Sequence, residues 1–475
     1  GQAVRDAGDH FACVTMDWWP SNKCDYDVCP WGDAGILTAP IEDERLVRAL
    51  HGLGPVTLRL GGTQADNITY VLGEDSGIAC PDFFSPAPPT LSNNFTGGCF
   101  TAERWQQFHD FCSAEKDCRL VFGINLMNGR DRQEARWDEP CPGEWDWSNA
   151  KALIDATVAA NLSVYGYELG NEIQCLTPET FAGDVHTLAA LMDEAYGSAP
   201  HLARPRIIVT DQLEWEPLFF HRFVPLVTDV ADVITWHEYP LGPGYGNDAL
   251  DDEVMNASFH DRFLRTAQSA HDTVSSLSDG QLEVWMGETG GAFNSGHNLT
   301  SNAFMDAFWY LESLAGFAKS GHTGFCRQTL IGGNYELVDK ETLVPNPDFY
   351  ALSLFSMLMG PQVLSARLTA PEDQVRVWSH CTATSYADAS VTLLALNYLD
   401  SAVELSLPSG TSGATLKVFQ VTADDLHSRS VLLNGAYLAP ESDGTLPTLE
   451  PISTTGPTLG LPANSYTFLV LPADA

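Results

Sequence analysis

Short apolar runs alternate with longer stretches of helical spacing over residues 12–355 of the chain. The spacing predicts helices over residues 102–112, 149–161 and 302–320. Eight apolar runs predict strands: VTMD ending at Asp17, TLRLGG at Gly62, LVFGIN at Asn125, VYGYELGNE at Glu172, RIIVTD at Asp211, VITWH at His237, LEVWMGE at Glu288 and GFCRQ at Gln328. Each gap between runs leaves room for a loop and a helix. Eight strand–helix repeats predict an α/β fold, a (β/α)8 TIM barrel, over residues 12–355. An open parallel sheet has a similar alternation, but the number of runs favours the barrel.

The pattern changes after residue 355. Residues 356–475 contain short runs such as SVTLLALNYL and SYTFLVLP, in which apolar and polar positions alternate with a period of two. Gly, Pro, Ser and Asp separate these runs. The pattern predicts a C-terminal β-sandwich domain over residues 356–475. Because no low-complexity linker separates the two parts, we expect them to pack rigidly.

Two glutamates lie at the ends of predicted strands, where a barrel of this type carries its reactive side chains. Glu172 ends the fourth run and Glu288 ends the seventh, so they should face each other across the barrel mouth. Glycoside hydrolysis needs two such carboxyl groups, one as proton donor and one as nucleophile or base. A separation of about 5–5.5 Å would indicate retention of configuration, and about 6.5–9.5 Å would indicate inversion. The sequence therefore predicts a pair of catalytic carboxyl groups.

The charge balance excludes several classes of partner. The chain has 24 Lys and Arg against 62 Asp and Glu, a formal net charge of −38. Such a surface repels nucleic acid, anionic lipid and sulfated polyanions. No apolar run reaches the roughly 18–20 residues that span a bilayer, so we expect no integral membrane segment. Nucleotide-binding glycine motifs are also missing, which disfavours a nucleotide enzyme.

The cysteines predict disulfides rather than a metal site. The chain has 11 cysteines, and Cys24–Cys29 and Cys112–Cys118 each bracket a short loop. Paired C-x2-C motifs for zinc are missing, and we expect no metal. The odd number leaves at least one thiol free or paired between chains. Cys326 and Cys381 lie in apolar, strand-like segments and are interpreted as buried thiols.

Five N-x-S/T sequons accompany these cysteines and indicate a secretory route. The numbering begins at Gly1, which we interpret as a processed chain that has lost an export signal. A secreted, extracellular protein of cell wall or matrix is expected, with a lysosomal or vacuolar one as the alternative. The predicted glycosylation sites are Asn67, Asn94, Asn161, Asn256 and Asn298.

The segments around the two glutamates resemble those of a known family. YELGNE (167–172) and VWMGETGGAFNSG (284–296) are similar to the acid/base and nucleophile segments of the heparanase family, glycoside hydrolase family 79. Further segments resemble its plant-type heparanase-like branch, including LRLGGTQAD, FGINLMNGR and FCRQTLIGGNYELVDKETLVPNPDFY. The resemblance runs from about residue 11 to the C-terminus. It implies a barrel beside a β-sandwich, to which residues 1–11 could add a strand, and a retaining β-glucuronidase.

The resemblance also implies roles for individual residues. Glu172 would be the acid/base and Glu288 the nucleophile, with Tyr239 holding Glu288. Asn171 would donate to the sugar 2-hydroxyl, and His237 is either a substrate contact or a core histidine. The glucuronate carboxylate would be held by Tyr335 and by the loop after the nucleophile. The implied substrate-binding residues are Asp17, Thr63, Asn171, His237, Tyr239, Asn294, Ser295, Gln328, Gly333 and Tyr335. Asp17 could instead be a helix cap.

The sequence departs from the family in ways that bear on the substrate. Phe293 occupies a position where related sequences often carry tyrosine, and basic residues are scarce. Animal heparanase needs a cationic cleft for its sulfated chain, so we expect heparan sulfate to be a poor substrate. A cell-wall arabinogalactan ending in β-glucuronate, or a small aryl glucuronide, fits better.

The leading hypothesis is a secreted retaining β-glucuronidase that acts through a covalent glycosyl-enzyme and needs no cofactor. Its partner would be a glucuronate-containing glycan or glycoside, and the sequence leaves its oligomeric state open. The alternative is a catalytically weak glycan-binding or structural extracellular protein on the same scaffold, because a fold alone does not establish activity.

Overall fold

The computed structural model describes residues 3–21, 24, 28–72, 97–113, 117–130, 141–369, 374–411 and 413–472. Parallel strands form a closed barrel in chain order, with the last strand pairing to the first. Their side chains are almost entirely buried, as expected for parallel strands covered on both faces. The barrel strands are β2 (Ala12–Asp17), β3 (Val56–Gly61), β6 (Cys118–Ile124), β7 (Gly166–Leu169), β8 (Arg206–Gln212), β9 (Val233–His237), β10 (Glu283–Thr289) and β11 (Gly324–Arg327). Each predicted run coincides with one of them, so the barrel prediction is confirmed.

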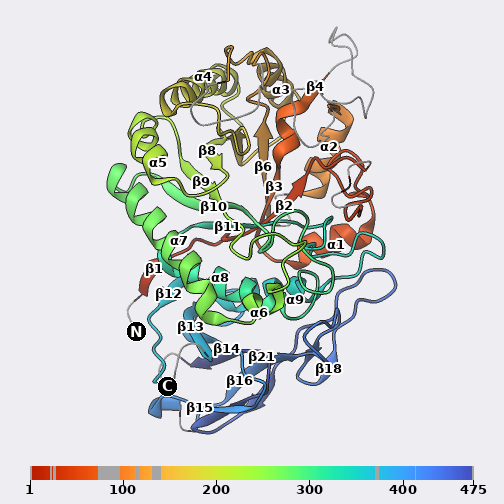
Figure 1. Cartoon of the computed structure of the whole chain (residues 1–475), viewed down its shortest axis with the longest axis vertical. Helices are drawn as coiled ribbons and strands as arrows, with labels where there is room; N and C mark the ends of the chain where they lie inside the picture. The colour runs from red at the N-terminus through yellow and green to blue at the C-terminus, as the bar shows by residue number, and fades with distance from the viewer. Residues whose placement is uncertain are drawn as a thin grey trace.

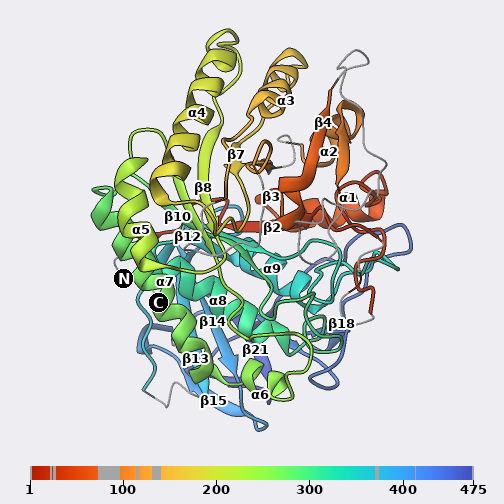
Figure 2. The ribbon, with the colours of Figure 1, turned by 45° about the horizontal axis from the view of Figure 1, so that its top comes forward.

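Helices follow most of the barrel strands and surround the barrel (Figure 1; Figure 2). α4 illustrates the local signals, since Thr177 caps its first turn and Pro178 occupies a position where no N–H group is needed. The three predicted helical segments correspond to α2, α3 and α8. The helices are α1 (Glu44–Gly52), α2 (Ala102–Phe111), α3 (Ser148–Ala159), α4 (Pro178–Gly197), α5 (Pro217–Phe223), α6 (Leu250–Val254), α7 (Ala257–Leu277), α8 (Asp306–Ser320) and α9 (Pro347–Leu358).

An antiparallel sheet lies beside the barrel (Figure 1). Its strand order is β1 (Ala3–Asp6), β12 (Met359–Leu364), β13 (Val375–Thr382), β14 (Ser390–Asn397), β21 (Ser465–Pro472), β16 (Leu416–Thr422), β17 (Leu432–Leu433) and β18 (Ala436–Tyr437), with β19 (Ile452–Thr454) also paired to β16. A separate ribbon joins β15 (Val403–Ser406) to β20 (Thr458–Leu461). A further parallel pair, β4 (Ile68–Val71) and β5 (Gly98–Thr101), lies outside the barrel.

The period of two in β21 explains how this sheet packs on both faces. Tyr466 and Phe468 belong to the core shared with the barrel, whereas Leu469 and Leu471 belong to a second core with residues of the β15–β20 ribbon. The predicted combination of a barrel with C-terminal β-structure is therefore confirmed. The boundary at residue 355 stays a prediction: α9 ends at Leu358 and β12 begins at Met359, and the N-terminal strand β1 pairs with β12.

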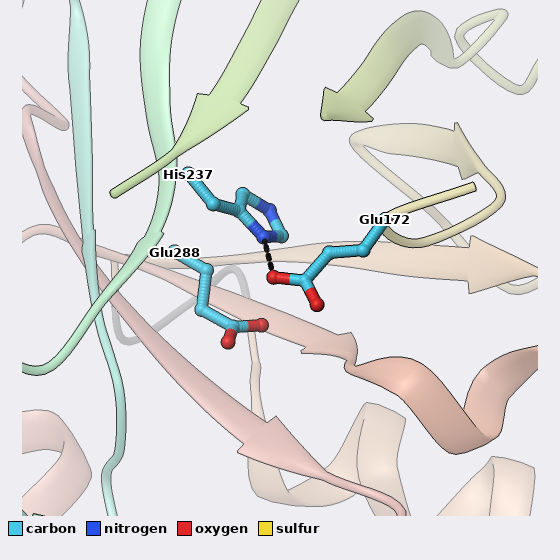
Figure 3. A group of neighbouring side chains, drawn as sticks. All are labelled: Glu172, His237 and Glu288. Atoms are coloured by element: carbon cyan, nitrogen blue, oxygen red, sulfur yellow. Dashed lines mark hydrogen bonds and ion pairs between the residues drawn. The ribbon is translucent and has the colours of Figure 1, made fainter. Parts of the chain in front are cut away.

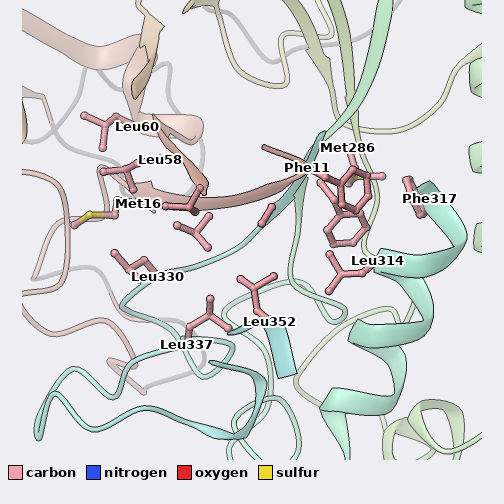
Figure 4. Packing of buried hydrophobic residues seen from close by; sticks show 14 of the residues in the cluster. Phe11, Met16, Leu58, Leu60, Met286, Leu314, Phe317, Leu330, Leu337 and Leu352 are labelled. Atoms are coloured by element: carbon pink, nitrogen blue, oxygen red, sulfur yellow. The ribbon is translucent and has the colours of Figure 1, made fainter. Parts of the chain in front are cut away.

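One continuous apolar core connects the barrel to this sheet. Met16, Leu58 and Met286 come from barrel strands, and Leu314 of α8 and Leu352 of α9 pack near them (Figure 4). α8 is buried nearly all round because it lies between the barrel and the sheet. Among the described residues, no helix combines the length and apolar character needed to cross a membrane.

The interpretation of Cys326 as a buried thiol is wrong. Cys326 forms a disulfide with Cys13, which lies opposite it on the neighbouring strand where β11 meets β2. Disulfides join the neighbouring cysteines Cys24 and Cys29 and the neighbouring cysteines Cys112 and Cys118, and Cys141–Cys175 is a further disulfide. Cys381, in β13, is a free thiol, but it is partly exposed rather than buried.

Candidate active site

Glu172 and Glu288 converge at the carboxyl end of the barrel. Glu172 follows β7 and Glu288 lies near the end of β10. An oxygen of each carboxylate and a ring nitrogen of His237 lie within 4.8 Å of one another (Figure 3). The Glu172 side chain is 19% exposed and that of Glu288 is 8% exposed. Both acids are therefore sheltered but still reach the surface.

The backbone before Glu172 turns sharply and aims this side chain inward. Gly170 has a φ of 74°, and a Cβ there would lie 2.9 Å from the Leu126 side chain. Glu172 itself has a φ of 53°, in the left-handed region that non-glycine residues rarely adopt. Its N–H group donates to the Asp211 carbonyl oxygen at 2.8 Å. Such a conformation persists when the surroundings fix it, and it is common at active sites.

His237, at the end of β9, bridges two carboxylates. Its Nδ1 lies 2.9 Å from Oε1 of Glu172 and its Nε2 lies 3.0 Å from Oδ1 of Asp211. Burial alone would lower the pKa of this imidazole, but Asp211 and then Glu288 outweigh burial and raise it to about 10. Burial raises the pKa of Glu172, and the hydrogen bond from His237 opposes that rise. A carboxyl group with a raised pKa is suited to act as an acid.

Glu288 is held by two donors. The Tyr239 hydroxyl donates to Oε1 at 2.6 Å, and Nη1 of Arg59 donates to Oε2 at 2.9 Å. Burial, followed by the charge of Glu288, raises the pKa of Tyr239 well above its usual value, so this phenol stays a donor. The two bonds fix the orientation of this carboxyl group, as a nucleophile requires.

Arg59 is the centre of this buried network, and the sequence analysis missed it. Its guanidinium also donates to Glu168 at 2.6 Å, to Asp211, and to Oδ1 of Asn171 at 2.8 Å. Burial disfavours this charge, but Asp211, Glu168 and Glu288 together keep the pKa of Arg59 well above its usual value. One signal was available in the sequence: an arginine inside the apolar run TLRLGG must be paired when the strand is buried.

The charge of the network is balanced through Glu168 and Asp211. Burial, and then the neighbouring Asp211, raise the pKa of Glu168 well above its usual value although Arg59 opposes this. Burial would also raise the pKa of Asp211, but Arg59 and His237 reverse the sign and hold it far below its usual range. Two cations, Arg59 and His237, therefore lie among the carboxyl groups of Glu168, Glu172, Asp211 and Glu288.

Asn171 and Asp17 line the same end of the barrel. Oδ1 of Asn171 accepts from Arg59 and from the Gly62 N–H group, whereas its Nδ2 has no hydrogen-bond partner among the described residues. Asp17, at the end of β2, accepts from Nε2 of Gln328 at 3.0 Å. A Cβ on Gly62 would lie 2.4 Å from the Asp17 carboxyl group, so glycine is required there. Thr63 follows directly, at the start of a short 3-10 helix.

Two loops lie together beside Tyr239. Ser295, in the loop after β10, accepts from the Trp31 indole at 2.9 Å through Oγ, and its carbonyl accepts from the Asn334 N–H group at 2.7 Å. The Tyr335 ring lies 6.4 Å from the Tyr239 ring. Asn294 and Ser295 both have left-handed backbone conformations, with φ of 55° and 68°. A Cβ on Gly333 would lie 2.6 Å from the Tyr335 ring. Predicted residues from both loops thus lie close to Tyr239, which is bonded to Glu288.

Glu172, His237 and Glu288 also have the spacing of a metal-ligand set. A metal needs the lone pair of a neutral imidazole. Both ring nitrogens of His237 face carboxylate oxygens instead, and its raised pKa keeps them protonated. The cluster therefore fits acid–base chemistry better than metal binding.

The sequons differ in their exposure. Asn161, Asn256 and Asn298 are exposed, whereas Asn67 is partly buried and its Nδ2 atom is covered. Since a glycan attaches through Nδ2, Asn67 is poorly placed to carry one. Asn94 lies outside the described residues.

Comparisons with known proteins agree with this geometry. Residues 1–315 match the family model "Glycosyl hydrolase family 79, N-terminal domain". Over 99% of the chain and 90% of the relative, the sequence is 33% identical to the baicalin-beta-D-glucuronidase of Scutellaria baicalensis. It is 27% identical to the heparanase of Bos taurus over 92% of the chain and 87% of that protein.

A solved structure agrees with the fold. The 4-O-alpha-L-rhamnosyl-beta-D-glucuronidase from Fusarium oxysporum superposes with a TM-score of 0.67 and 15% identity, covering 99% of the chain and 97% of that structure. At this identity the similarity concerns the fold alone. The match over most of the chain and the identity to full-length relatives show that the chain is a glycoside hydrolase and belongs to glycosyl hydrolase family 79.

Proposed function

We propose that this protein is a retaining β-glucuronidase in which Glu288 is the nucleophile and Glu172 the acid/base. The observation that carries the proposal is the approach of the two carboxylates, which have oxygens within 4.8 Å of one another. Such a close approach of the nearest oxygens supports direct attack on the anomeric carbon, for which the two carboxyl groups stand about 5–5.5 Å apart. The glucuronide specificity of the Scutellaria baicalensis relative supports the choice of sugar.

The reaction takes two steps. In the first, a Glu288 oxygen forms a bond to the anomeric carbon, the glycosidic C–O bond breaks, and Glu172 gives its proton to the departing oxygen. In the second, Glu172 takes a proton from water, whose oxygen displaces Glu288 from the sugar. Asn171 offers an Nδ2–H donor that has no other partner among the described residues, which suits a bond to the sugar 2-hydroxyl.

Recognition of the sugar uses the groups around the nucleophile. Asp17 accepts hydrogen bonds from hydroxyl groups of the sugar, and Gln328 donates to them. Thr63 lines the same pocket. The glucuronate carboxylate lies against the backbone N–H groups of Asn294 and Ser295 and the hydroxyl of Tyr335. The contact between the two loops supports the assignment, because the Asn334 N–H group donates to the Ser295 carbonyl and so brings this loop beside Tyr335.

The natural substrate carries little charge beyond the terminal glucuronate. The net charge of −38 repels a sulfated chain, and Arg59 is already bound to three carboxylates. A small aryl glucuronide or a β-glucuronate-capped arabinogalactan is the preferred class. The disulfides Cys13–Cys326 and Cys141–Cys175 support folding in an oxidising compartment, and hence a secreted or lysosomal/vacuolar protein.

The test compares a 4-nitrophenyl β-glucuronide, glucuronate-capped arabinogalactan and heparan sulfate side by side. We expect turnover of the first two, with proton NMR showing β-glucuronic acid as the first product. A 2-deoxy-2-fluoro glucuronide should label Glu288, as seen by peptide mapping. First appearance of the α-anomer would overturn retention, labelling elsewhere would overturn the nucleophile, and turnover only of other glycosides would overturn the choice of sugar.

A further inference from the structure

Both ring nitrogens of His237 face carboxylates: Nδ1 makes a hydrogen bond with Glu172, and Nε2 lies within ion-pair distance of Asp211. Nδ1 faces Glu172 and Nε2 faces Asp211, at 2.9 and 3.0 Å. A neutral imidazole carries one N–H group and one lone pair, so one of its nitrogens would repel an ionised partner. His237 is fully buried, and no water can replace either carboxylate without a rearrangement. Its protonation state is therefore set by these neighbours.

Asp211 is the partner that stays charged. It is fully buried at the end of β8, where Oδ2 accepts from Arg59 and Oδ1 faces Nε2 of His237. The other ionisable groups around His237 are Glu172 after β7 and Glu288 on β10, while Arg59 and Glu168 act through Asp211. Glu172 alternates between acid and base in the reaction, and Glu288 becomes esterified. Among these carboxylates, Asp211 is the one whose charge persists next to the ring throughout the cycle.

We propose that Asp211 is a positioning residue for the acid catalyst: it keeps a proton on each nitrogen of His237, so that Nδ1–H occupies Oε1 of Glu172 and the catalytic proton is carried on Oε2. The other carboxylate oxygen of Glu172 points away from the ring in Figure 3. This inference rests on the proposed role of Glu172 as acid/base. It adds a reason why the acid presents its proton to the leaving group rather than to the neighbouring imidazole.

The arrangement also stabilises the product of proton transfer. When the glycosidic C–O bond breaks, its electron pair goes to the leaving oxygen, which takes the proton from Oε2 of Glu172. The Glu172 carboxylate formed in this way already accepts a hydrogen bond from a cation, which is stronger than a bond from a neutral donor. Without the Asp211 charge, a neutral His237 could accept the Glu172 proton at Nδ1 and withhold it from the substrate.

Asp211→Asn is the direct test, and Glu168→Gln is its matched control. Both residues are buried carboxyl groups that accept from Arg59, but the described contacts of Glu168 do not include His237. Any effect transmitted through Arg59 to Glu288 should therefore occur in both variants. An effect transmitted through His237 to Glu172 should be much larger in Asp211→Asn, because Glu168 reaches His237 only through Asp211.

The expected kinetic result depends on the leaving group. Asp211→Asn should lower kcat/KM for phenyl β-glucuronide, a poor leaving group, by about 10- to 100-fold, and should spare 2,4-dinitrophenyl β-glucuronide, which needs no proton. The charge of Asp211 raises the pKa of both His237 and Glu172. Its removal should therefore move the alkaline limb of the pH profile to lower pH, as a property of the coupled pair. Glu168→Gln should affect the two substrates equally and leave the alkaline limb in place.

A second measurement needs no substrate and reads the ring of His237 in the wild-type enzyme. In ¹⁵N-histidine-labelled wild-type enzyme, the His237 ring, assigned by its loss in His237→Gln, should keep the imidazolium signature at about pH 8, above the usual histidine pKa of about 6.5. Titration near 6.5 would overturn the proposal, as would identical kinetic profiles for Asp211→Asn and Glu168→Gln. If the wild type hydrolyses no aryl glucuronide, the proposed function fails, and the ring signal still decides the state of His237.

Discussion

Two buried ionic clusters of this protein have similar compositions but different surroundings. The site cluster consists of Arg59, Glu168, Asp211, His237 and Glu288. The interface cluster consists of His260, Asp261, Glu312, Arg376 and Tyr398. Each contains an arginine, a histidine and carboxyl groups, with at least one fully buried carboxylate. Charge and burial alone therefore do not distinguish a reactive site from a structural one.

The difference lies in what the bonds of each cluster connect. Glu312 of α8 is shared by His260 of α7 at 3.1 Å, Arg376 of β13 at 3.2 Å and the Tyr398 hydroxyl next to β14, so the interface cluster ties barrel helices to the C-terminal sheet. The site cluster instead holds two side chains at the barrel mouth, Glu172 through His237 and Glu288 through Arg59. The site cluster therefore differs in one respect: its bonds hold two carboxyl groups, those of Glu172 and Glu288, that face a common space.

The largest loss of activity should come from replacing Glu288, the proposed nucleophile in the site cluster. Glu288→Gln keeps the shape of the side chain but removes the attacking charge, so kcat/KM should fall by at least ~10⁴-fold. The measurement is steady-state hydrolysis of an aryl glucuronide, with circular dichroism as the check on folding. Activity of Glu288→Gln near the wild-type level would contradict the proposed role of Glu288 as the nucleophile.

A smaller loss of activity is expected when Glu172, the proposed acid/base, is replaced. Glu172→Ala should lower the rate by about 10²–10⁴-fold for poor leaving groups and much less for 2,4-dinitrophenyl glucuronide. Azide, a small anion that needs no base, should restore turnover and yield β-glucuronyl azide. Equal losses for good and poor leaving groups would contradict the acid role.

The interface cluster should give the opposite pattern. Glu312→Gln leaves the Arg376 guanidinium without its full partner, so the free energy of unfolding should fall by about 3–5 kcal/mol while kcat/KM of the folded enzyme changes by less than ~2-fold. Urea unfolding and aryl glucuronide kinetics on the same preparation measure both quantities. A kinetic loss comparable to that of Glu172→Ala would erase the distinction between the clusters.

The smallest predicted effect is a change in the pH dependence of stability. Because Asp211 and Glu288 raise the folded-state pKa of His237 to about 10, this residue stabilises the fold fully below its unfolded pKa of about 6.5. That contribution is lost as the pH rises from there through about 10. His237→Gln should therefore flatten the alkaline decline in thermal midpoint between these values. An unchanged slope in the variant would show that His237 is not the group responsible.

The barrel was accessible to sequence reasoning because its strands are buried on both faces. Runs such as RIIVTD and LEVWMGE are apolar over most of their length and end where the strand ends, so their order along the chain predicts their order around the barrel. The two glutamates were found by their positions at these ends. The resemblance to a family supplied the residues in the loops, whose positions depend on turns that no periodic pattern encodes.

Contacts between distant strands were harder to predict. Arg59 and Asp211 were not nominated, although Asp211 ends a predicted strand, because the carboxylates that pair with Arg59 come from three other strands. Cys326 was assigned as a free thiol because its partner is 313 residues away in sequence. Such pairs follow from the closure of the barrel, and a single sequence gives no direct measure of which distant strands become neighbours.

The Cys13–Cys326 bridge fixes more than the join between the first and last barrel strands. It locks the alignment of β11 against β2, and Asp17 and Gln328 stand only four and two residues beyond the linked cysteines. A slip of one residue would turn inward-facing side chains outward and separate that pair. Made where thiols remain reduced, the same polypeptide would have to reach this alignment through backbone hydrogen bonds alone. An oxidising compartment during synthesis thus helps to fix the positions of Asp17 and Gln328, the residues proposed to contact the sugar.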